Sequence, residues 1–418
     1  MKRSTCLILL CVVLFWGRLT ALAQETIELR FLCFNEGNEC EIYADLLSRF
    51  SQEHPDIAVA VEVMDEADIA SHLSEAVDTG GGPDIARIAD YPAFAGRYLD
   101  LRPLLADADS FAASFQAPFL EAMRADADDG IHGFPDAAAM VAPFVNVSLF
   151  EEAGLPLPSA DSSWVQWLSA LEAVKAATGV PYLVAVDNKD HRLVGPAMSL
   201  GARYFDEDGA LTLADDLGLR AILEILNQLL ELGRTPADTL LGTGKSQDYF
   251  ARGETLMYIC GSWKVEEVAA QVGADFDWAI VANPSGPGAG TGVVKATALV
   301  ALKDTAHPEA VTKVMDYLAQ PALIAEFSAR ALTIPAHLEV AASRIDYDTE
   351  NESIAAALNA FAGEVPNLQD QAIALDLHPL APVYYEASNE LLRGYFAGEF
   401  SLDEALAGLK ARLKRANE

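Results

Sequence analysis

A tryptophan directly after a predicted strand has a position that suggests a binding role. In YFARGETLMYICGSW (249–263), the apolar run Leu256–Cys260 predicts a short strand, and a Gly-Ser turn follows it before Trp263. Open α/β sheets bind ligands at the carboxyl ends of their strands, so the ring is placed to form the wall of a binding site. The alternative is an ordinary core tryptophan.

Polar and aromatic residues follow two other predicted strands in the same way. Asn35 and Glu36 come after the first strand, and Arg87, Asp90 and Tyr91 lie at or just past the end of the third. Ligands gather at carboxyl ends where the strand order reverses, which makes all five residues binding candidates. The alternative for each of them is a solvated loop position.

Patterns for catalysis, nucleotides or metals fail on inspection. LGTGKS (241–246) would need Gly at position 239 to complete a phosphate-binding loop, but that residue is Thr239, and a helix rather than a strand precedes it. GPGAG (286–290) lacks the strand-turn-helix context of a dinucleotide site. No GxSxG, CxxC or HExxH occurs. We therefore expect no enzyme activity, no cofactor and no metal.

The elements that would position these residues alternate between strand and helix. This alternation predicts an α/β fold with parallel strands and right-handed crossovers. A mostly helical tail begins at about residue 354. Strands are predicted over 26–34, 57–63, 83–90, 182–186, 256–260 and 278–281, and helices over 40–56, 67–82, 163–178 and 219–232.

The amino-terminal segment has the pattern of a secretory signal peptide. Lys2 and Arg3 precede an apolar stretch over 6–16, and Ala21-Leu22-Ala23 forms a cleavage site. Neither cysteine of this segment is placed for a lipid anchor. We expect residues 1–23 to be removed and the product to be soluble in a bacterial periplasm, with 395 residues that suffice for two domains.

The remaining chain is strongly acidic. The formal charge of the full sequence is −34, and loss of residues 1–23 removes three cations and no carboxylate, which leaves −37. Such a surface repels nucleic acid and anionic lipid, so neither is expected as a partner.

Three cysteines remain after removal of the signal peptide. Cys33 and Cys40 flank FNEGNE between a predicted strand and a predicted helix, and in an oxidising compartment they form either a local disulfide or two free thiols. Cys260 is expected to be buried as a small apolar residue.

Several segments together resemble the extracellular solute-binding proteins that serve ABC importers. YFARGETLMYICGSW is similar to the F-x-x-G-(E/K)-x-x-M-x-x-x-G-x-W stretch of the sugar-binding group that includes maltose-binding protein. One departure is Val145, where the family commonly has Tyr. Further segments follow in the family's order between Thr26 and Leu413, namely GGPDIARIADYPAFAGRYLDLRPL, IHGFPDAAAMVAPFVNVSLFEEAGL, GVVKATALVALKDTAHPEAVTKVMDYL, TIPAH and SLDEALAGLKARL.

The resemblance implies a two-lobed, type II periplasmic-binding-protein fold. Lobe 1 would hold 24–138 plus 286–335, and lobe 2 would hold 139–285 plus 336–418. A monomer would close on a mono- or oligosaccharide and deliver it to ABC permease subunits in the inner membrane. The alternatives are a binding protein for a polyamine or a peptide, or a secreted polysaccharide-active enzyme with a carboxylate pair across its groove.

The resemblance also assigns roles to single residues. Trp263 matches a tryptophan that stacks on a sugar face, and Tyr385 falls at another cleft aromatic, with a core position as its alternative. His191 and Arg192 stand where the family often has a stacking aromatic, and Lys295 lies at the return crossing between lobes.

These cations, with Arg87, lead to the hypothesis of an acidic saccharide such as a uronate oligomer, because guanidinium groups grip carboxylates. The alternative is that the cations neutralise nearby carboxylates or bind neutral hydroxyls.

Overall fold

Two separate sheets form the centres of two lobes in the computed structural model, which describes residues 26–418 except 80, 126–128 and 289–294. The predicted signal peptide lies outside the described residues. The first sheet has six strands in the order β12-β4-β11-β3-β1-β2. Its strands are β1 (Ile27–Cys33), β2 (Ile57–Val63), β3 (Ile85–Ile88), β4 (Gly133–Ala139), β11 (Lys295–Ala301) and β12 (Ile334–Pro335).

The second sheet has four strands in the order β10-β5-β9-β6, and a two-stranded sheet pairs β7 with β8. All seven residues of β9 are buried, which agrees with its uninterrupted apolar sequence. The strands are β5 (Val141–Asn146), β6 (Tyr182–Ala185), β7 (Arg203–Phe205), β8 (Leu211–Asp215), β9 (Thr255–Gly261) and β10 (Trp278–Ile280).

The predicted parallel arrangement holds for only part of each sheet. β1 runs parallel to β2 and β3, and β6 runs parallel to β9. In contrast, β11 is antiparallel to both β3 and β4, and β5 is antiparallel to β9 and β10. The physical reason is that β4 carries the chain toward the second sheet and β11 begins where the chain returns from it, so the two strands run in opposite directions.

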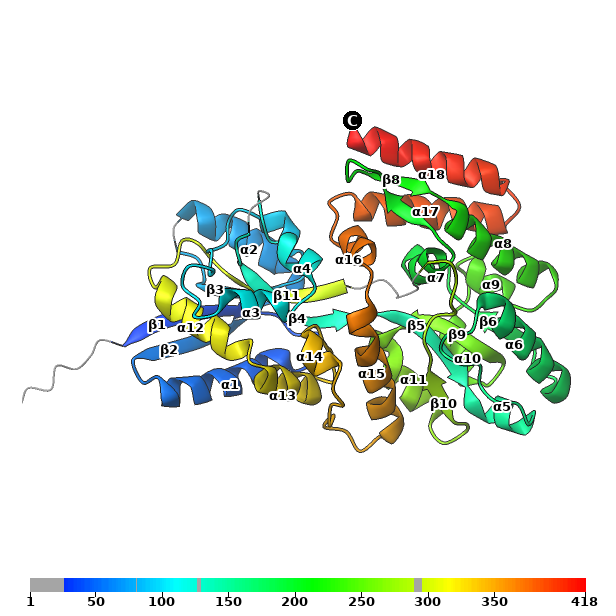
Figure 1. Cartoon of the computed structure of the whole chain (residues 1–418), viewed down its shortest axis with the longest axis horizontal. Helices are drawn as coiled ribbons and strands as arrows, with labels where there is room; N and C mark the ends of the chain where they lie inside the picture. The colour runs from blue at the N-terminus through cyan, green and yellow to red at the C-terminus, as the bar shows by residue number, and fades with distance from the viewer. Residues whose placement is uncertain (1–25, 80, 126–128, 289–294) are drawn as a thin grey trace, which may run out of the picture.

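Helices cover the first sheet and form its lobe, here called the first lobe (Figure 1). The apolar face of α1 buries Ile42, Leu46 and Phe50, as expected for an amphipathic helix. The helices of this lobe are α1 (Glu39–Glu53), α2 (Glu66–Thr79), α3 (Ala108–Ala113), α4 (Ala117–Glu121), α12 (Pro308–Leu318), α13 (Pro321–Ala331) and α14 (Leu338–Ala341), with the 3₁₀ turn η1 (Tyr91–Phe94).

The second sheet is covered by a larger set of helices, which form the second lobe. In α6, Ser163 and Gln166 form a capping box, and Gly179 ends the helix with a φ of 76°, which glycine adopts without strain. The helices are α5 (Val147–Glu152), α6 (Trp164–Thr178), α7 (Val194–Ser199), α8 (Leu217–Glu231), α9 (Ala237–Leu240), α10 (Ser246–Ala251), α11 (Val265–Val272), α17 (Ala381–Phe396) and α18 (Leu402–Asn417), with the turns η2 (Asp190–Arg192) and η3 (Ser262–Lys264).

The two lobes are joined by extended chain and by helices that touch both of them. Only Met140 separates β4 of the first sheet from β5 of the second. Helix α15 (Glu352–Glu364) contacts β12 and β10, and α16 (Asp370–Asp376) contacts α4 and β7, with η4 (Val365–Asn367) between them. Figure 1 shows α15 and α16 between the lobes.

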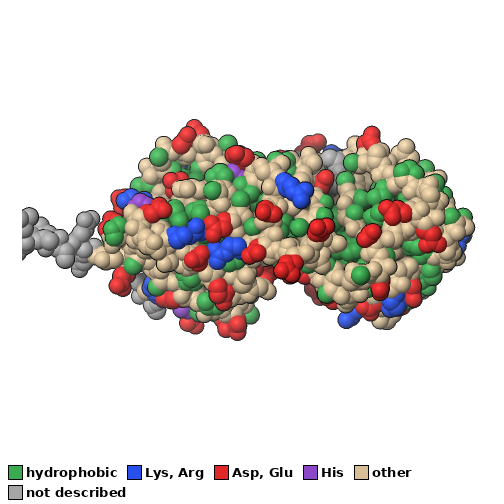
Figure 2. All heavy atoms as spheres, turned by 90° about the horizontal axis from the view of Figure 1, so that it is seen from below, with side chains coloured by type: hydrophobic (Ala, Val, Ile, Leu, Met, Phe, Trp, Pro, Cys, Tyr) green, Lys and Arg blue, Asp and Glu red, His purple; other side chains and the backbone are tan. Residues whose placement is uncertain are grey.

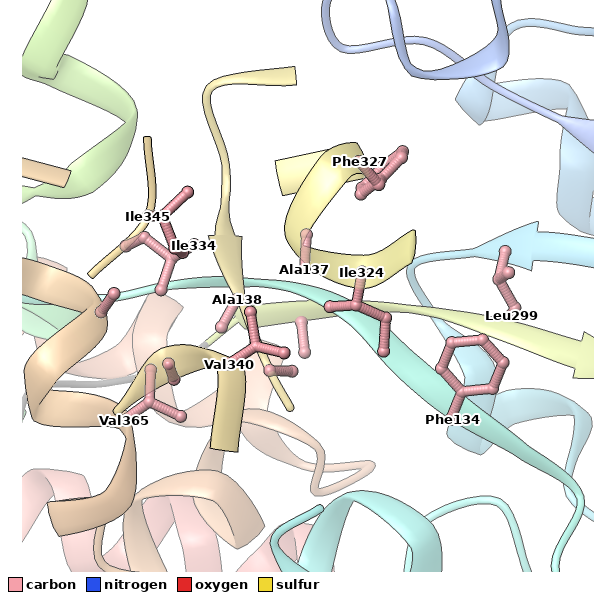
Figure 3. Close-up of a cluster of buried hydrophobic side chains, with 14 of the residues drawn as sticks. Phe134, Ala137, Ala138, Leu299, Ile324, Phe327, Ile334, Val340, Ile345 and Val365 are labelled. Carbon is pink, nitrogen blue, oxygen red and sulfur yellow. The ribbon is translucent and has the colours of Figure 1, made fainter. Parts of the chain in front are cut away.

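A buried apolar cluster holds the crossing strands in place (Figure 3). Phe134 of β4 lies beside Leu299 of β11, its partner in the ladder. Ile324, Ile334 and Val340 cover the same region from α13, β12 and α14. Because these side chains are almost fully buried, the point at which the chain leaves the first lobe is firmly packed.

The predicted helices and strands are confirmed, with boundary shifts of one to three residues in most elements. None of the helices in the described part of the chain is both long and apolar enough to span a membrane. The face shown in Figure 2 carries many more Asp and Glu than Lys and Arg side chains, in keeping with the net charge.

Candidate ligand-binding site

Two pockets lie between the lobes and share Lys295. The first, here called the Trp263 pocket, has a volume of about 260 Å³, and the second, the Asp376 pocket, has a volume of about 470 Å³. Polar or aromatic side chains of the Trp263 pocket are Glu36, Glu39, Ser262, Trp263, Glu266, Lys295, Thr297 and Thr333. Those of the Asp376 pocket are Glu66, Asp90, Lys295, Asp376, His378 and Tyr385.

Trp263 is held as a platform at the end of a strand. It lies in η3, directly after β9, and 47% of its surface is exposed although it is among the largest apolar side chains of the protein. The preceding turn is tied to the crossing between the lobes, since the Ser262 amide donates to the Met140 carbonyl oxygen over 2.8 Å. A large exposed ring on a fixed backbone favours a stacking role over a core role.

His191 lies between the two predicted cleft aromatics. Its ring centroid is 5.8 Å from that of Trp263 and 6.2 Å from that of Tyr385. The turn η2 that carries His191 is fixed to α17, because the Asp190 amide donates to Asn389 Oδ1 over 2.7 Å. Burial lowers the pKa of His191 to about 4, with the charge of Lys189 acting in the same direction, so this ring is neutral at neutral pH.

The loop after β1 is braced from within. A disulfide joins Cys33 to Cys40, while Cys260 is free and buried. Asn35 Oδ1 accepts the Cys40 amide over 2.8 Å, and the Glu39 carboxylate accepts the amide of Glu36 over 3.0 Å. The side chain of Asn35 is therefore used to hold the loop, whereas Glu36 lines the Trp263 pocket.

The prediction of Arg87 as a solute-facing cation is wrong for this conformation. Its side chain is fully buried, with Nε 2.8 Å from Asp136 Oδ2 and Nη2 3.0 Å from the Thr297 hydroxyl. Tyr43 donates to the same carboxylate over 2.8 Å. Because a buried charge must be paired, the Arg87–Asp136 pair binds β3 to β4, and β11 joins through Thr297.

Tyr91 and Asp90, which follow β3, differ in their exposure to solvent. Tyr91 is fully buried in the first lobe, and its carbonyl oxygen accepts the Tyr98 hydroxyl over 2.8 Å. It is a core residue, so its predicted exposure to the solute is wrong. Asp90 is exposed and lines the Asp376 pocket.

Arg192 is also unavailable to a solute. It is 7% exposed and forms an ion pair with Asp187 inside the second lobe. With Arg87 paired to Asp136 and His191 neutral, Lys295 is the one predicted cation that faces both pockets. The pairing of Arg87 and Arg192 agrees with the alternative to the acidic-saccharide hypothesis, in which the arginines neutralise local carboxylates.

Asp376 and His378 are pocket residues that the sequence analysis missed. Burial raises the pKa of Asp376 to about 7, although Lys295 acts in the opposite direction, and burial lowers the pKa of His378. The segment DLHPLAP (376–382) contains no motif that predicts a binding role. Its one signal is two prolines just before the predicted cleft residue Tyr385.

A polar cluster is buried behind His191. Asp190 has no exposed surface, and burial raises its pKa to about 6, although the hydroxyls of Tyr384 and Ser388 act in the opposite direction. Tyr204 stacks edge-on against Tyr384 at 5.5 Å. This cluster joins η2 to α17, and those two elements carry His191 and Tyr385.

Two α/β lobes, crossing segments between them and pockets lined from both lobes define a two-lobed solute-binding protein. The profile of the bacterial extracellular solute-binding protein family matches residues 45–357, and the chain belongs to this family.

Two relatives of known name are also binding proteins. The chain is 25% identical to a lactose-binding protein of Rhizobium radiobacter over 266 residues, which are 62% of this chain and 61% of that protein, and 24% identical to a binding protein of Brucella abortus over 72% of this chain and 73% of that protein.

Solved structures show the same fold. The sugar-binding protein MalE of Xanthomonas citri superposes with a TM-score of 0.74 at 20% identity, covering 93% of this chain and 96% of that chain. A sugar transporter protein of Rhizobium etli in an open conformation gives 0.73 at 20% identity, covering 93% and 99%.

Proposed function

We propose that this protein captures a saccharide between its lobes and delivers it to the permease of an ABC importer. The observation that carries the proposal is the half-exposed ring of Trp263, fixed at the end of β9 against a pocket lined from both lobes. An aromatic platform beside hydrogen-bonding carboxylates suits a sugar, which has an apolar face and a rim of hydroxyls. The similarity to a lactose-binding protein of Rhizobium radiobacter and to the sugar-binding protein MalE of Xanthomonas citri supports the same solute class.

The arrangement of the pockets favours an oligosaccharide over a single sugar. The Trp263 pocket and the Asp376 pocket adjoin at Lys295, and each contains at least one aromatic ring, Trp263 in one and Tyr385 in the other. One sugar unit in each pocket would place Lys295 beside the linkage. Arg87 and Arg192 give no support to an acidic saccharide, since both are paired with carboxylates inside their lobes.

Delivery requires that the permease distinguish the loaded from the empty protein. We infer that the first and second lobes move as two bodies about the crossings, by a hinge motion. The protein would act as a monomer in the periplasm and release the solute to permease subunits in the inner membrane. It binds without turnover, as do the solute-binding proteins of its family.

A thermal-shift screen of the purified mature protein tests the proposal. A solute that binds only the native state raises the melting temperature, so di- and trisaccharides should produce the largest shifts in a panel that also contains polyamines and short peptides. Chromatography of the bound solute after incubation should return it unchanged. A largest shift from a polyamine or a peptide would contradict the saccharide, and a hydrolysed product would contradict binding without turnover.

A further inference from the structure

Carboxylates outnumber cations in the lining of the Asp376 pocket. Three carboxylates line it, those of Glu66, Asp90 and Asp376, against the single ammonium of Lys295. Lys295 is itself exposed and shared with the Trp263 pocket, where Glu36 and Glu266 also lie. A concave surface lined mainly by one sign of charge concentrates ligands of the opposite sign.

Asp376 is the only one of these three carboxylates that is not exposed. It is the last residue of α16, a helix that contacts both lobes, and it is mostly buried. Among the described residues, no hydrogen bond and no ion pair within 4.0 Å reaches its carboxylate. Burial without a partner disfavours the ionised form, and this raises its pKa to about 7. The end of a helix also favours a positive charge nearby.

Of the side chains that line this pocket, only Lys295 carries a positive charge at neutral pH. Burial lowers the pKa of His378, which keeps its ring neutral at neutral pH. The charge of Lys295 lowers the pKa of Asp376, but by less than burial raises it. Arg87 and Arg192 are committed to Asp136 and Asp187. The carboxylate is thus left for a cation that arrives with the solute.

The remaining lining suits a sugar ring. Tyr385 forms one wall, and Pro379, Pro382, Ala93 and Leu377 add apolar surface. A pocket of about 470 Å³ lies within the ~300–1,000 Å³ of small-molecule sites. A flexible polyamine would also use the carboxylates and lay its methylene groups on this wall, so the experiment below includes spermidine.

We propose that the sugar unit held in the Asp376 pocket bears an ammonium group that pairs with Asp376, so that the solute is an oligosaccharide containing an amino sugar. This inference rests on the proposed function and narrows its solute class. The pair would be a charge-assisted hydrogen bond in a partly dry site, where such bonds are strongest. The same pocket would disfavour a uronate through like-charge repulsion.

Three β-1,4 disaccharides separate the charge from the shape. Calorimetric titrations at neutral pH would compare the β-1,4 dimer of glucosamine, its N-acetylated form and cellobiose. We expect the free amine to bind about tenfold more tightly than cellobiose or the acetylated dimer, since a hydrogen bond between charged groups contributes more than a neutral one. Asp376→Asn should reduce this preference to about threefold or less.

A matched variant controls for the change in overall charge. Asp304→Asn removes one carboxylate from an exposed position that lines a different pocket of the first lobe, and it should leave the preference unchanged. An amine that binds no more tightly than cellobiose overturns the inference, whether both bind or neither does. A preference that persists in Asp376→Asn overturns it as well.

Failure of the inference and failure of the proposed function give different results. If neutral disaccharides bind the wild type and the amine gains nothing, the saccharide function stands and the amino-sugar inference fails. If spermidine raises the melting temperature more than any sugar does, both fail.

Discussion

The ring of Trp263 lies directly over the α carbon of Gly261. A β carbon at position 261 would fall inside the contact distance of three ring atoms, Cζ3, Cη2 and Cε3. The backbone at Gly261 is extended, with a φ of −97°, so the absence of a side chain rather than an unusual conformation is what this position requires. Gly261 therefore allows the ring to lie flat at the end of β9.

Gly261→Ala should displace the Trp263 ring and weaken sugar binding. The new methyl group occupies the space of the ring, and the ring is the mobile partner because 47% of its surface is exposed. We expect about a tenfold loss of affinity or more, measured by calorimetry, because small misplacements of a binding group are costly.

A double-mutant cycle shows whether this effect acts through the ring. In a Trp263→Ala background, Gly261→Ala should cause no further loss of affinity, because no ring remains to be displaced. Equal losses in both backgrounds would mean that Gly261 affects the site by another route.

The buried Arg87–Asp136 pair should control stability. Arg87→Met leaves the Asp136 carboxylate buried beside the Tyr43 and Thr297 hydroxyls without its cation, and such a loss costs about 3–5 kcal/mol. The free energy of unfolding in urea measures it. Arg412→Met is the control, since it breaks an ion pair with Glu390 on the surface and should cost less than about 1 kcal/mol. Similar costs for the two variants would contradict a structural role for Arg87.

The buried carboxyl of Asp190 should make stability depend on pH. Its pKa is about 6 in the folded protein and about 3.9 in an unfolded chain, so the folded state binds the proton more tightly. This contribution is fully present below about pH 4 and is lost as the pH rises through 6. Between pH 4 and 7, the stability of Asp190→Asn should therefore fall by about 2 kcal/mol less than that of the wild type. Parallel stability curves would show that Asp190 titrates normally.

Local patterns predicted the elements well because their causes are local. The signals used were the periodic spacing of apolar residues, the Ser163–Gln166 cap and the turn glycines, and each depends only on neighbours in the chain. The strands and helices were therefore predicted near their true positions. The antiparallel course of β11 was missed, since its direction depends on a return from the second lobe. That return involves residues far from β11 in the sequence.

The site was predictable only where a residue stands at the end of a recognisable strand. Trp263, Glu36 and Asp90 line the pockets for that reason. Arg87 occupies a similar position, but its partner Asp136 lies 49 residues away in the sequence, and no local pattern predicts the pair. Asp376 reaches the cleft because α16 packs between the lobes, which depends on the tertiary structure alone.

Titration of Trp263→Ala with the best disaccharide of the thermal-shift screen is the most direct test of sugar capture between the lobes. We expect affinity to fall by a few kcal/mol, as for other central aromatic anchors, while the melting temperature of the unliganded protein stays close to that of the wild type because the ring is half exposed. Trp167→Ala, in contrast, should lower the free energy of unfolding by about 3–5 kcal/mol, since that ring is 1% exposed. Unchanged sugar affinity in folded Trp263→Ala would contradict binding at this ring.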